Sequence, residues 1–165
     1  MVQRGEAKVP VIVELSIANA MASHLFDRES ERRGLRVTQV GLLVLIGKHS
    51  PITPTALEEV TGLAPTTLRD RMRTLVGDGY VHRLPNEADR RSYLLETTEK
   101  GTAFLRATKP VIRATEEAIS RHLGSPFEEF RGQLERLTQA AHTALHEAPP
   151  LRGGGTKRGS AVVST

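Results

Sequence analysis

The chain has 165 residues, enough for one domain with a sizeable core, and its hydrophobic and charged fractions of 38% and 25% are ordinary for a globular protein. It contains no cysteine, which excludes disulfides and thiolate metal sites, and no apolar run of membrane-spanning length. The N-terminal residues also lack the pattern of a signal peptide, so we expect a cytoplasmic protein that does not bind membranes.

The net charge of +4 is concentrated at the two ends of the chain. Residues 10–150 carry equal numbers of acidic and basic side chains, whereas residues 151–165 carry basic residues and no acid. We expect a flexible N-terminus over residues 1–9, one domain over residues 10–148 and a disordered basic tail over residues 149–165. Because the domain itself is nearly neutral, the positions of its arginines say more about an anionic partner than the net charge does.

Helical periodicity, capping residues and breakers predict helices along the whole domain. The expected helices span residues 10–33, 37–49, 54–60, 65–77, 99–123 and 125–147. Thr53 caps the third of these helices, Pro65 opens the fourth, and Thr97 or Thr98 caps the fifth, which stops at Gly124. Ser125 and Pro126 are the expected N-cap and first residue of the last helix.

Apolar residues recur at steps of three and four along both terminal helices. These residues are Val11, Leu15 and Ala18 in the first helix and Phe127, Phe130, Leu134, Leu137 and Ala141 in the last. They either cover a core of their own chain or form a dimer interface. We favour dimerisation helices at residues 10–34 and 102–148, because few other elements remain for them to cover.

The middle of the chain, residues 35–101, has the order of a winged helix-turn-helix. A short helix and a longer one are joined by a tight turn at Gly62, and two short strands, 80–85 and 92–97, follow at once. The expected fold is therefore mainly α with a small β-hairpin wing, and dimerisation helices flank the winged helix-turn-helix.

The helix at residues 65–77 is the expected recognition helix. On a helical wheel its apolar residues Leu68, Met72, Leu75 and Val76 share one arc, which we expect to face the core. The opposite arc and its edges are polar, and they consist of Thr66, Thr67, Arg69, Asp70, Arg71, Arg73 and Thr74. Such side chains suit base edges and phosphates of a major groove, although a solvated amphipathic helix would show the same pattern. Asp70 would accept a hydrogen bond from cytosine or would orient Arg69 or Arg73.

The tip between the two strands carries an acid, two arginines and a serine, at Asp89, Arg90, Arg91 and Ser92. An arginine at the tip of a wing suits the enhanced negative potential of a narrow minor groove. We expect Asp89 to pair with the guanidinium of Arg91 and to set its direction before DNA binds.

Residues 52–101 resemble the winged helix-turn-helix of the MarR (multiple antibiotic resistance regulator) family. The resemblance rests on the acid-x-Arg-Ser wing motif at Asp89, Arg91 and Ser92, on Thr97 and Gly101 after it, and on the run Gly79-Tyr80-Val81 before it. It implies a homodimeric transcription factor on a palindromic operator, with Arg91 in the minor groove and a small aromatic ligand that releases DNA. Where the family often has arginine, this chain has Asp70 and Thr74, and Arg36 replaces a frequent threonine cap.

The remaining constellations predict no catalytic site. His142 and His146 have the i, i+4 spacing of a metal pair, but they lack an evident third ligand, and we interpret them as surface histidines. His24 could line a ligand pocket, and nothing distinguishes it from an ordinary helix histidine. We expect a sequence-specific, double-stranded DNA-binding repressor without metal or cofactor other than a small aromatic or drug-like effector. The alternative is a winged-helix module that binds another protein.

Overall fold

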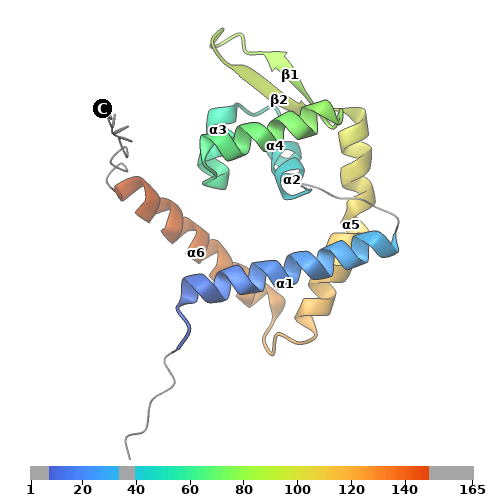
Figure 1. The fold of residues 1–165 in the computed structure, drawn as a ribbon, viewed down its shortest axis with the longest axis vertical. Helices are drawn as coiled ribbons and strands as arrows, with labels where there is room; N and C mark the ends of the chain where they lie inside the picture. The colour runs from blue at the N-terminus through green and yellow to red at the C-terminus, as the bar shows by residue number, and fades with distance from the viewer. Residues whose placement is uncertain (1–7, 34–39, 149–165) are drawn as a thin grey trace, which may run out of the picture. The chain divides into compact units, whose positions relative to one another are not determined.

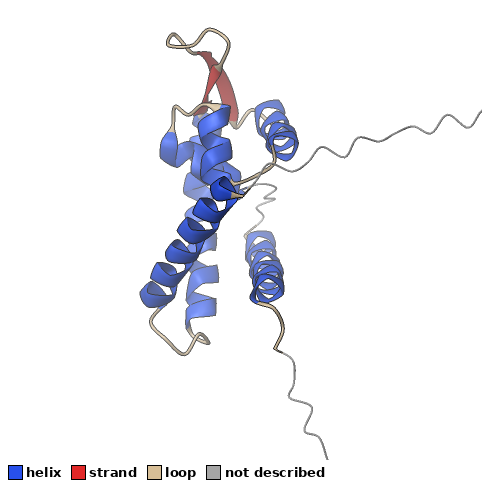
Figure 2. Ribbon diagram, turned by 90° about the vertical axis from the view of Figure 1, so that its left-hand side faces the viewer, coloured by secondary structure: helices blue, strands red, loops and turns tan. Residues whose placement is uncertain are grey.

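The computed structural model describes residues 8–33 and 40–148. It contains the helices α1 (Val11–Arg32), α2 (Val40–His49), α3 (Pro54–Thr61), α4 (Pro65–Gly77), α5 (Glu99–Ser120) and α6 (Phe127–Glu147), and the strands β1 (Val81–Pro85) and β2 (Tyr93–Thr97) (Figure 1). This is the expected mainly helical fold with one antiparallel hairpin, and Figure 2 shows the hairpin as the only strands of the described residues. The expected flexible N-terminus lies outside the described residues except for its last two positions, and the expected basic tail lies wholly outside them.

The chain divides into two compact units, one that ends at Pro126 and one that begins at Phe127. The first unit contains α1 to α5 and the hairpin, and α6 is the described helix of the second. None of the described helices combines the length and the apolar composition that a membrane crossing requires.

The core of the first unit lies where α2, α3, α4 and the hairpin meet. Its fully buried side chains include Leu43, Ile46, Leu57, Leu68, Leu75 and Leu95. Ile52, between α2 and α3, exchanges two backbone hydrogen bonds with Leu95 of β2, at 3.1 and 2.8 Å, and so attaches the hairpin to the helices. The position of the wing is therefore set by backbone pairing as well as by apolar packing.

Local sequence determines the turn between α3 and α4. The hydroxyl of Thr53 accepts a hydrogen bond from the backbone of Ala56 at 3.1 Å, which caps α3 as expected. Gly62 closes the helix with φ of 63°, a conformation that glycine adopts at little cost. Pro65 then opens α4.

Among the described residues, two expected helix ends differ from the structure by more than one residue. α5 ends at Ser120 and not at Leu123, because His122 and Leu123 donate to carbonyls three residues earlier and so tighten the chain into a turn before Gly124. α6 begins at Phe127, so Pro126 precedes the helix and is not its first residue. The expected start of the second helix, at residue 37, lies outside the described residues, as does Arg36.

A junction at Tyr80 joins the end of α4, the base of the wing and the start of α5. Thr98 caps α5 by accepting from the backbone of Gly101 at 3.0 Å, and its hydroxyl donates to the carbonyl of Gly79 at 2.7 Å. The backbone N–H of Thr98 donates to the carbonyl of Tyr80 at 3.0 Å. Gly101 is buried against that same carbonyl, and a Cβ at this position would collide with it.

We predict that Gly101→Ala lowers the free energy of unfolding by about 1–3 kcal/mol, because backbone atoms must shift to admit the methyl group. Gly41→Ala is the matched control, since a Cβ on this exposed helical glycine meets nothing within 4 Å. It should leave stability unchanged or raise it by up to about 1 kcal/mol. Urea denaturation followed by circular dichroism measures both, and equal effects of the two substitutions would contradict a close approach at Tyr80.

Candidate nucleic-acid interface

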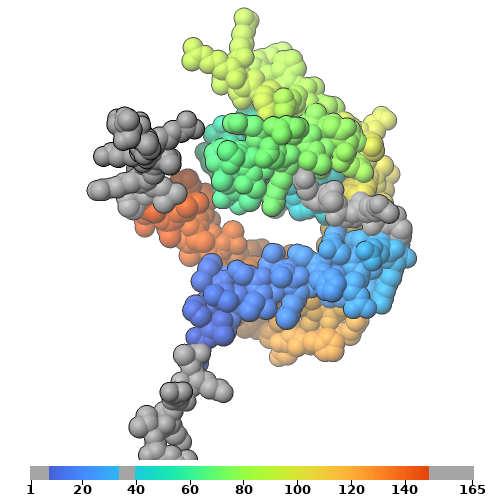
Figure 3. Space-filling model, in the orientation of Figure 1, coloured from blue at the N-terminus to red at the C-terminus, as the bar shows by residue number. Residues whose placement is uncertain are grey.

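Apolar packing fixes the rotation of α4 about its own axis. Leu68, Met72 and Leu75 are at most 4% exposed and contact the core, and Val76 is half-buried beside them. This is the arc that the helical wheel assigned to the core. The other side of α4 must therefore face outward, and Figure 3 shows it on the surface of the first unit.

The outward face of α4 carries every residue that the sequence assigned to it. Thr66, Thr67, Arg69, Asp70, Arg71, Arg73 and Thr74 are all exposed. Asp70 accepts a hydrogen bond from the guanidinium of Arg73 at 3.0 Å, with side chains 69% and 72% exposed. Such an exposed pair contributes only about 0.2–1 kcal/mol. Of the roles expected for Asp70, the structure shows one, the orientation of Arg73. Because the ion pair is weak, Arg73 can leave Asp70 easily.

The two remaining arginines of this face are unpaired within the described part of the chain. Neither Arg69 nor Arg71 forms an ion pair with a described residue. Both guanidinium groups are exposed and keep all their donors available. The face thus combines free cations, one loosely held arginine and three hydroxyl groups, which can act together as donors and acceptors.

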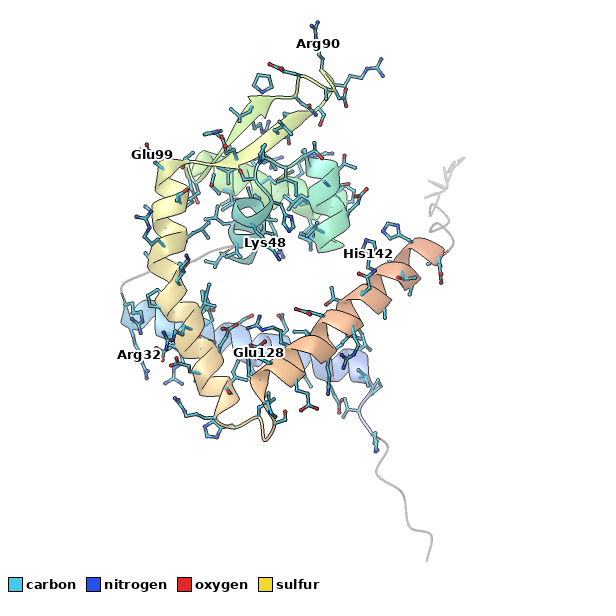
Figure 4. All side chains as sticks on the ribbon, turned by 180° about the vertical axis from the view of Figure 1, so that it is seen from behind. Arg32, Lys48, Arg90, Glu99, Glu128 and His142 are labelled. Atoms are coloured by element: carbon cyan, nitrogen blue, oxygen red, sulfur yellow. The ribbon has the colours of Figure 1, made fainter. Side chains whose placement is uncertain are left out.

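The wing extends from the core as a regular hairpin. Its strands pair in the register Val81↔Thr97 to Pro85↔Tyr93, and the loop between them carries the expected tip residues. Asp89, Arg90 and Arg91 are exposed, and Ser92 is half-buried. Figure 4 shows Arg90 at the end of the loop, directed away from the body of the unit.

Asp89 does not have its expected partner. Its carboxylate accepts from the backbone N–H of Arg91 at 3.0 Å, and no ion pair joins it to the guanidinium of Arg91 among the described residues. The carbonyl of Asp89 also accepts from the backbone of Ser92 at 2.9 Å. An aspartate carboxylate reaches the backbone N–H two residues ahead more easily than it reaches the side chain of that residue. The hydrogen bond to the N–H closes a compact turn. The expected pairing is therefore wrong, and Asp89 instead shapes the backbone that carries Arg91.

Contacts between the strands stiffen the wing and add a residue that the sequence analysis missed. The guanidinium of Arg83 lies 4.5 Å from the centre of the Tyr93 ring, and its side chain is exposed on the stem of the hairpin. His82 and Glu96, which are directly opposite in the register, lie 3.0 Å apart. Arg83 and Tyr93 are diagonal neighbours across the hairpin. The alternation of side chains along a strand indicates from the sequence that Arg83 faces away from His82. Only the register of the hairpin identifies Tyr93 as the aromatic partner of Arg83.

The apolar residues expected at a dimer interface stay largely uncovered within their own units. Val11 is 64% exposed in α1, and Phe130, Leu134 and Leu137 are 37%, 44% and 40% exposed in α6. Leu15 and Phe127 are half-buried, whereas Ala18 and Ala141 are exposed. α1 packs against α5 and buries Ser30, and α6 buries none of its residues. These faces satisfy a requirement of an interface, and whether two chains use them remains a prediction.

Residues 35–93 match the family model described as MarR family. The structure agrees, because a crystal structure of MarR superposes with a TM-score of 0.71 at 23% identity, covering 88% of this chain and 100% of that one. Residues 35–93 are thus similar to the MarR family in sequence, and the chain as a whole is similar to MarR in fold. Its fold is that of the MarR family transcriptional regulators, with the winged helix at the place that the sequence predicted.

Two similar structures were solved with DNA. The M. tuberculosis transcriptional regulator MOSR, in complex with DNA, is 26% identical with a TM-score of 0.67, covering 83% of this chain and 98% of that one. A mutant MarR from E. coli, complexed with operator DNA, is 22% identical with a TM-score of 0.67, covering 81% and 94% of the two chains. No protein of curated function matches the sequence.

We predict that Asp89→Ala loosens the tip of the wing, because it removes the acceptor for the N–H of Arg91. Asp89→Asn is the matched variant, since it removes the charge but keeps a side-chain oxygen at the same place. Amide hydrogen exchange of Arg91, measured by NMR, should accelerate in the alanine variant and stay near that of the native chain in the asparagine variant. Equal exchange in all three proteins would remove Asp89 from the architecture of the loop.

Proposed function

We propose that this protein is a sequence-specific, double-stranded DNA-binding regulator of transcription that acts as a homodimer. The observation that carries the proposal is the outward face of α4, on which seven polar side chains are exposed while the opposite face is buried. The two similar structures named above were solved as complexes with DNA, which supports DNA binding as the task of this fold.

The exposed groups divide naturally between base edges and phosphates. Arg73 would exchange its weak pair with Asp70 for a guanine, to which a guanidinium donates two hydrogen bonds. Asp70 would then be free to accept from cytosine, and the hydroxyls of Thr66 and Thr67 lie near the N-terminus of the same helix. Arg69 and Arg71, at the edges of this face, would bind phosphates and so place the helix in the groove.

The wing would contribute a second, minor-groove contact. Arg90 and Arg91 are exposed at its tip, and a guanidinium is weakly hydrated, so it enters a narrow A·T-rich groove more readily than an ammonium does. Arg83 extends the positive charge down the stem of the hairpin. The backbone turn at Asp89 holds the loop before DNA arrives, which lowers the ordering cost of binding.

We predict that Arg91→Ala weakens binding to an operator by roughly tenfold or more, because it removes the contact that fits the minor groove. The operator is first obtained by selection of bound genomic fragments, and affinity is then measured by fluorescence anisotropy. Arg113→Ala is the matched control, since its exposed guanidinium is paired with Glu117 on α5 at 2.7 Å. Equal affinity of the two variants would exclude Arg91 from DNA binding, and failure to enrich any fragment would favour a protein-binding module.

The proposal of a homodimer rests on the uncovered apolar residues of α1 and α6. Besides the residues expected from the sequence, Ile12, Ile17, Met21 and Leu145 are at least 46% exposed. Water in contact with so much apolar surface costs free energy, which association with a second copy would recover. A twofold pair would then present two α4 helices to successive major grooves, which lie about 34 Å apart.

We predict that Leu134→Glu converts the dimer to a monomer, because it introduces a charge into the apolar stripe of α6. Gln139→Glu is the matched control, since position 139 lies roughly 140° around the helix from Leu134 and adds the same charge off the stripe. Sedimentation velocity of both variants at micromolar concentration measures the outcome. A native chain that sediments as a monomer would overturn the proposal of a dimer.

We also propose that the regulator is a repressor that a small aromatic or drug-like effector releases from DNA. This part of the proposal rests on the resemblance to the MarR family, and it assigns no residue to the effector. Addition of aromatic acids to the operator complex should lower its anisotropy if the proposal holds. The proposed activity is binding, and it requires no catalytic residue.

A further inference from the structure

Two histidines near the end of α6 point their ring nitrogens at the same place. The Nε2 atoms of His142 and His146 lie 3.1 Å apart, and the centres of the two rings lie 4.3 Å apart. Both side chains are exposed, and Figure 4 shows His142 near the end of the helix. Among the described residues, neither ring has another hydrogen-bond or ion-pair partner.

The separation of these two nitrogens matches that of two ligands of one metal ion. Imidazole nitrogens bind zinc at about 2.0–2.1 Å, so two of them in tetrahedral or octahedral coordination lie roughly 2.9–3.4 Å apart. The observed distance falls inside this range without rotation of either ring. A hydrogen bond between two neutral imidazole rings has a similar length. For a metal ion to replace it, the donor ring must carry its proton on Nδ1, which frees its Nε2 to bind the metal.

We propose that His142 and His146 form a two-histidine chelate for a divalent transition-metal ion such as Zn²⁺, Ni²⁺ or Cu²⁺. Two histidines at i and i+4 on one helical face are the spacing by which helices bind zinc. Imidazole ligands select these ions against Mg²⁺ and Ca²⁺, which prefer oxygen. The described residues offer no group of three histidine or carboxylate side chains that could enclose a metal, so water completes the coordination.

The chelate lies off the apolar stripe of α6. On a wheel of about 100° per residue, His142 and His146 lie roughly 80° and 120° around the helix from Leu134. A partner that covers the stripe would therefore leave the two rings open to solvent, and the site does not depend on the proposed function. A metal ion that joins two successive turns would also stabilise the end of α6, a helix that buries none of its own residues.

Isothermal titration of the untagged full chain with Zn²⁺ and Ni²⁺ tests this site, with Mg²⁺ as the negative control. We expect one ion per chain, and His142→Gln and His146→Gln should each weaken binding by roughly tenfold or more, since each removes one of the two protein ligands. Glutamine keeps a hydrogen-bonding side chain on the helix, so loss of helix structure does not explain the result. His82→Gln is the matched control. The Nε2 atom of His82 lies 3.0 Å from a carboxylate oxygen of Glu96, so these two residues are the other pair of side chains that could bind the ion.

A spectroscopic measurement identifies the atoms that bind. On addition of Zn²⁺, the ¹⁵N shifts of the Nε2 atoms of His142 and His146 should move, while those of the other histidines stay in place. Zinc binding that survives both glutamine substitutions, or that disappears in His82→Gln alone, would overturn the proposal. Absence of binding by Zn²⁺ and Ni²⁺ to the native chain would overturn it as well.

Discussion

The burial of one face of α4 is the constraint on which the candidate interface depends. Leu68, Met72 and Leu75 enter the core among α2, α3 and the hairpin, and burying a side chain of this kind stabilises the fold by roughly 1.5–3 kcal/mol. A rotation of the helix by even one residue would replace some of this burial with polar groups that lack partners. The packing of the apolar face therefore turns the polar face outward. The contacts of the polar side chains need contribute little to the stability of this orientation.

The turn after α4 connects this helix to the wing and to α5. The carbonyls of Gly79 and Tyr80 accept hydrogen bonds from Thr98, and Gly101 lets the start of α5 approach the same backbone. Lys100 adds a hydrogen bond from its ammonium group to the carbonyl of Asp78 at 2.6 Å and lies 4.7 Å from the centre of the Tyr80 ring. The end of α4, the base of the wing and the start of α5 are thus connected by hydrogen bonds.

The terminal helices illustrate a different physical situation. α6 has a strong apolar stripe but no buried residue, whereas most of the stability of a helix in a protein comes from the packing of its apolar face. Its apolar side chains become stabilising only when another surface covers them. The proposed dimer would supply such a surface along the stripe, and the proposed chelate would stabilise the polar side of the same helix. The proposed dimer follows from the lack of a core of its own, whereas the proposed chelate follows from the positions of two ring nitrogens.

The sequence by itself determined the helices, the hairpin, the turn at Gly62 and the residues on each face of α4, because these depend on periodicity and on local capping. It also located Arg90 and Arg91 at the tip of the wing. Only the tertiary structure decided that Ile52 pairs with Leu95, that Thr98 donates to the carbonyl of Gly79 and that Arg83 lies over Tyr93. The physical reason is that local patterns specify the direction in which a side chain leaves the backbone, whereas its partner depends on rotamer and register, which are set once neighbouring elements are in place.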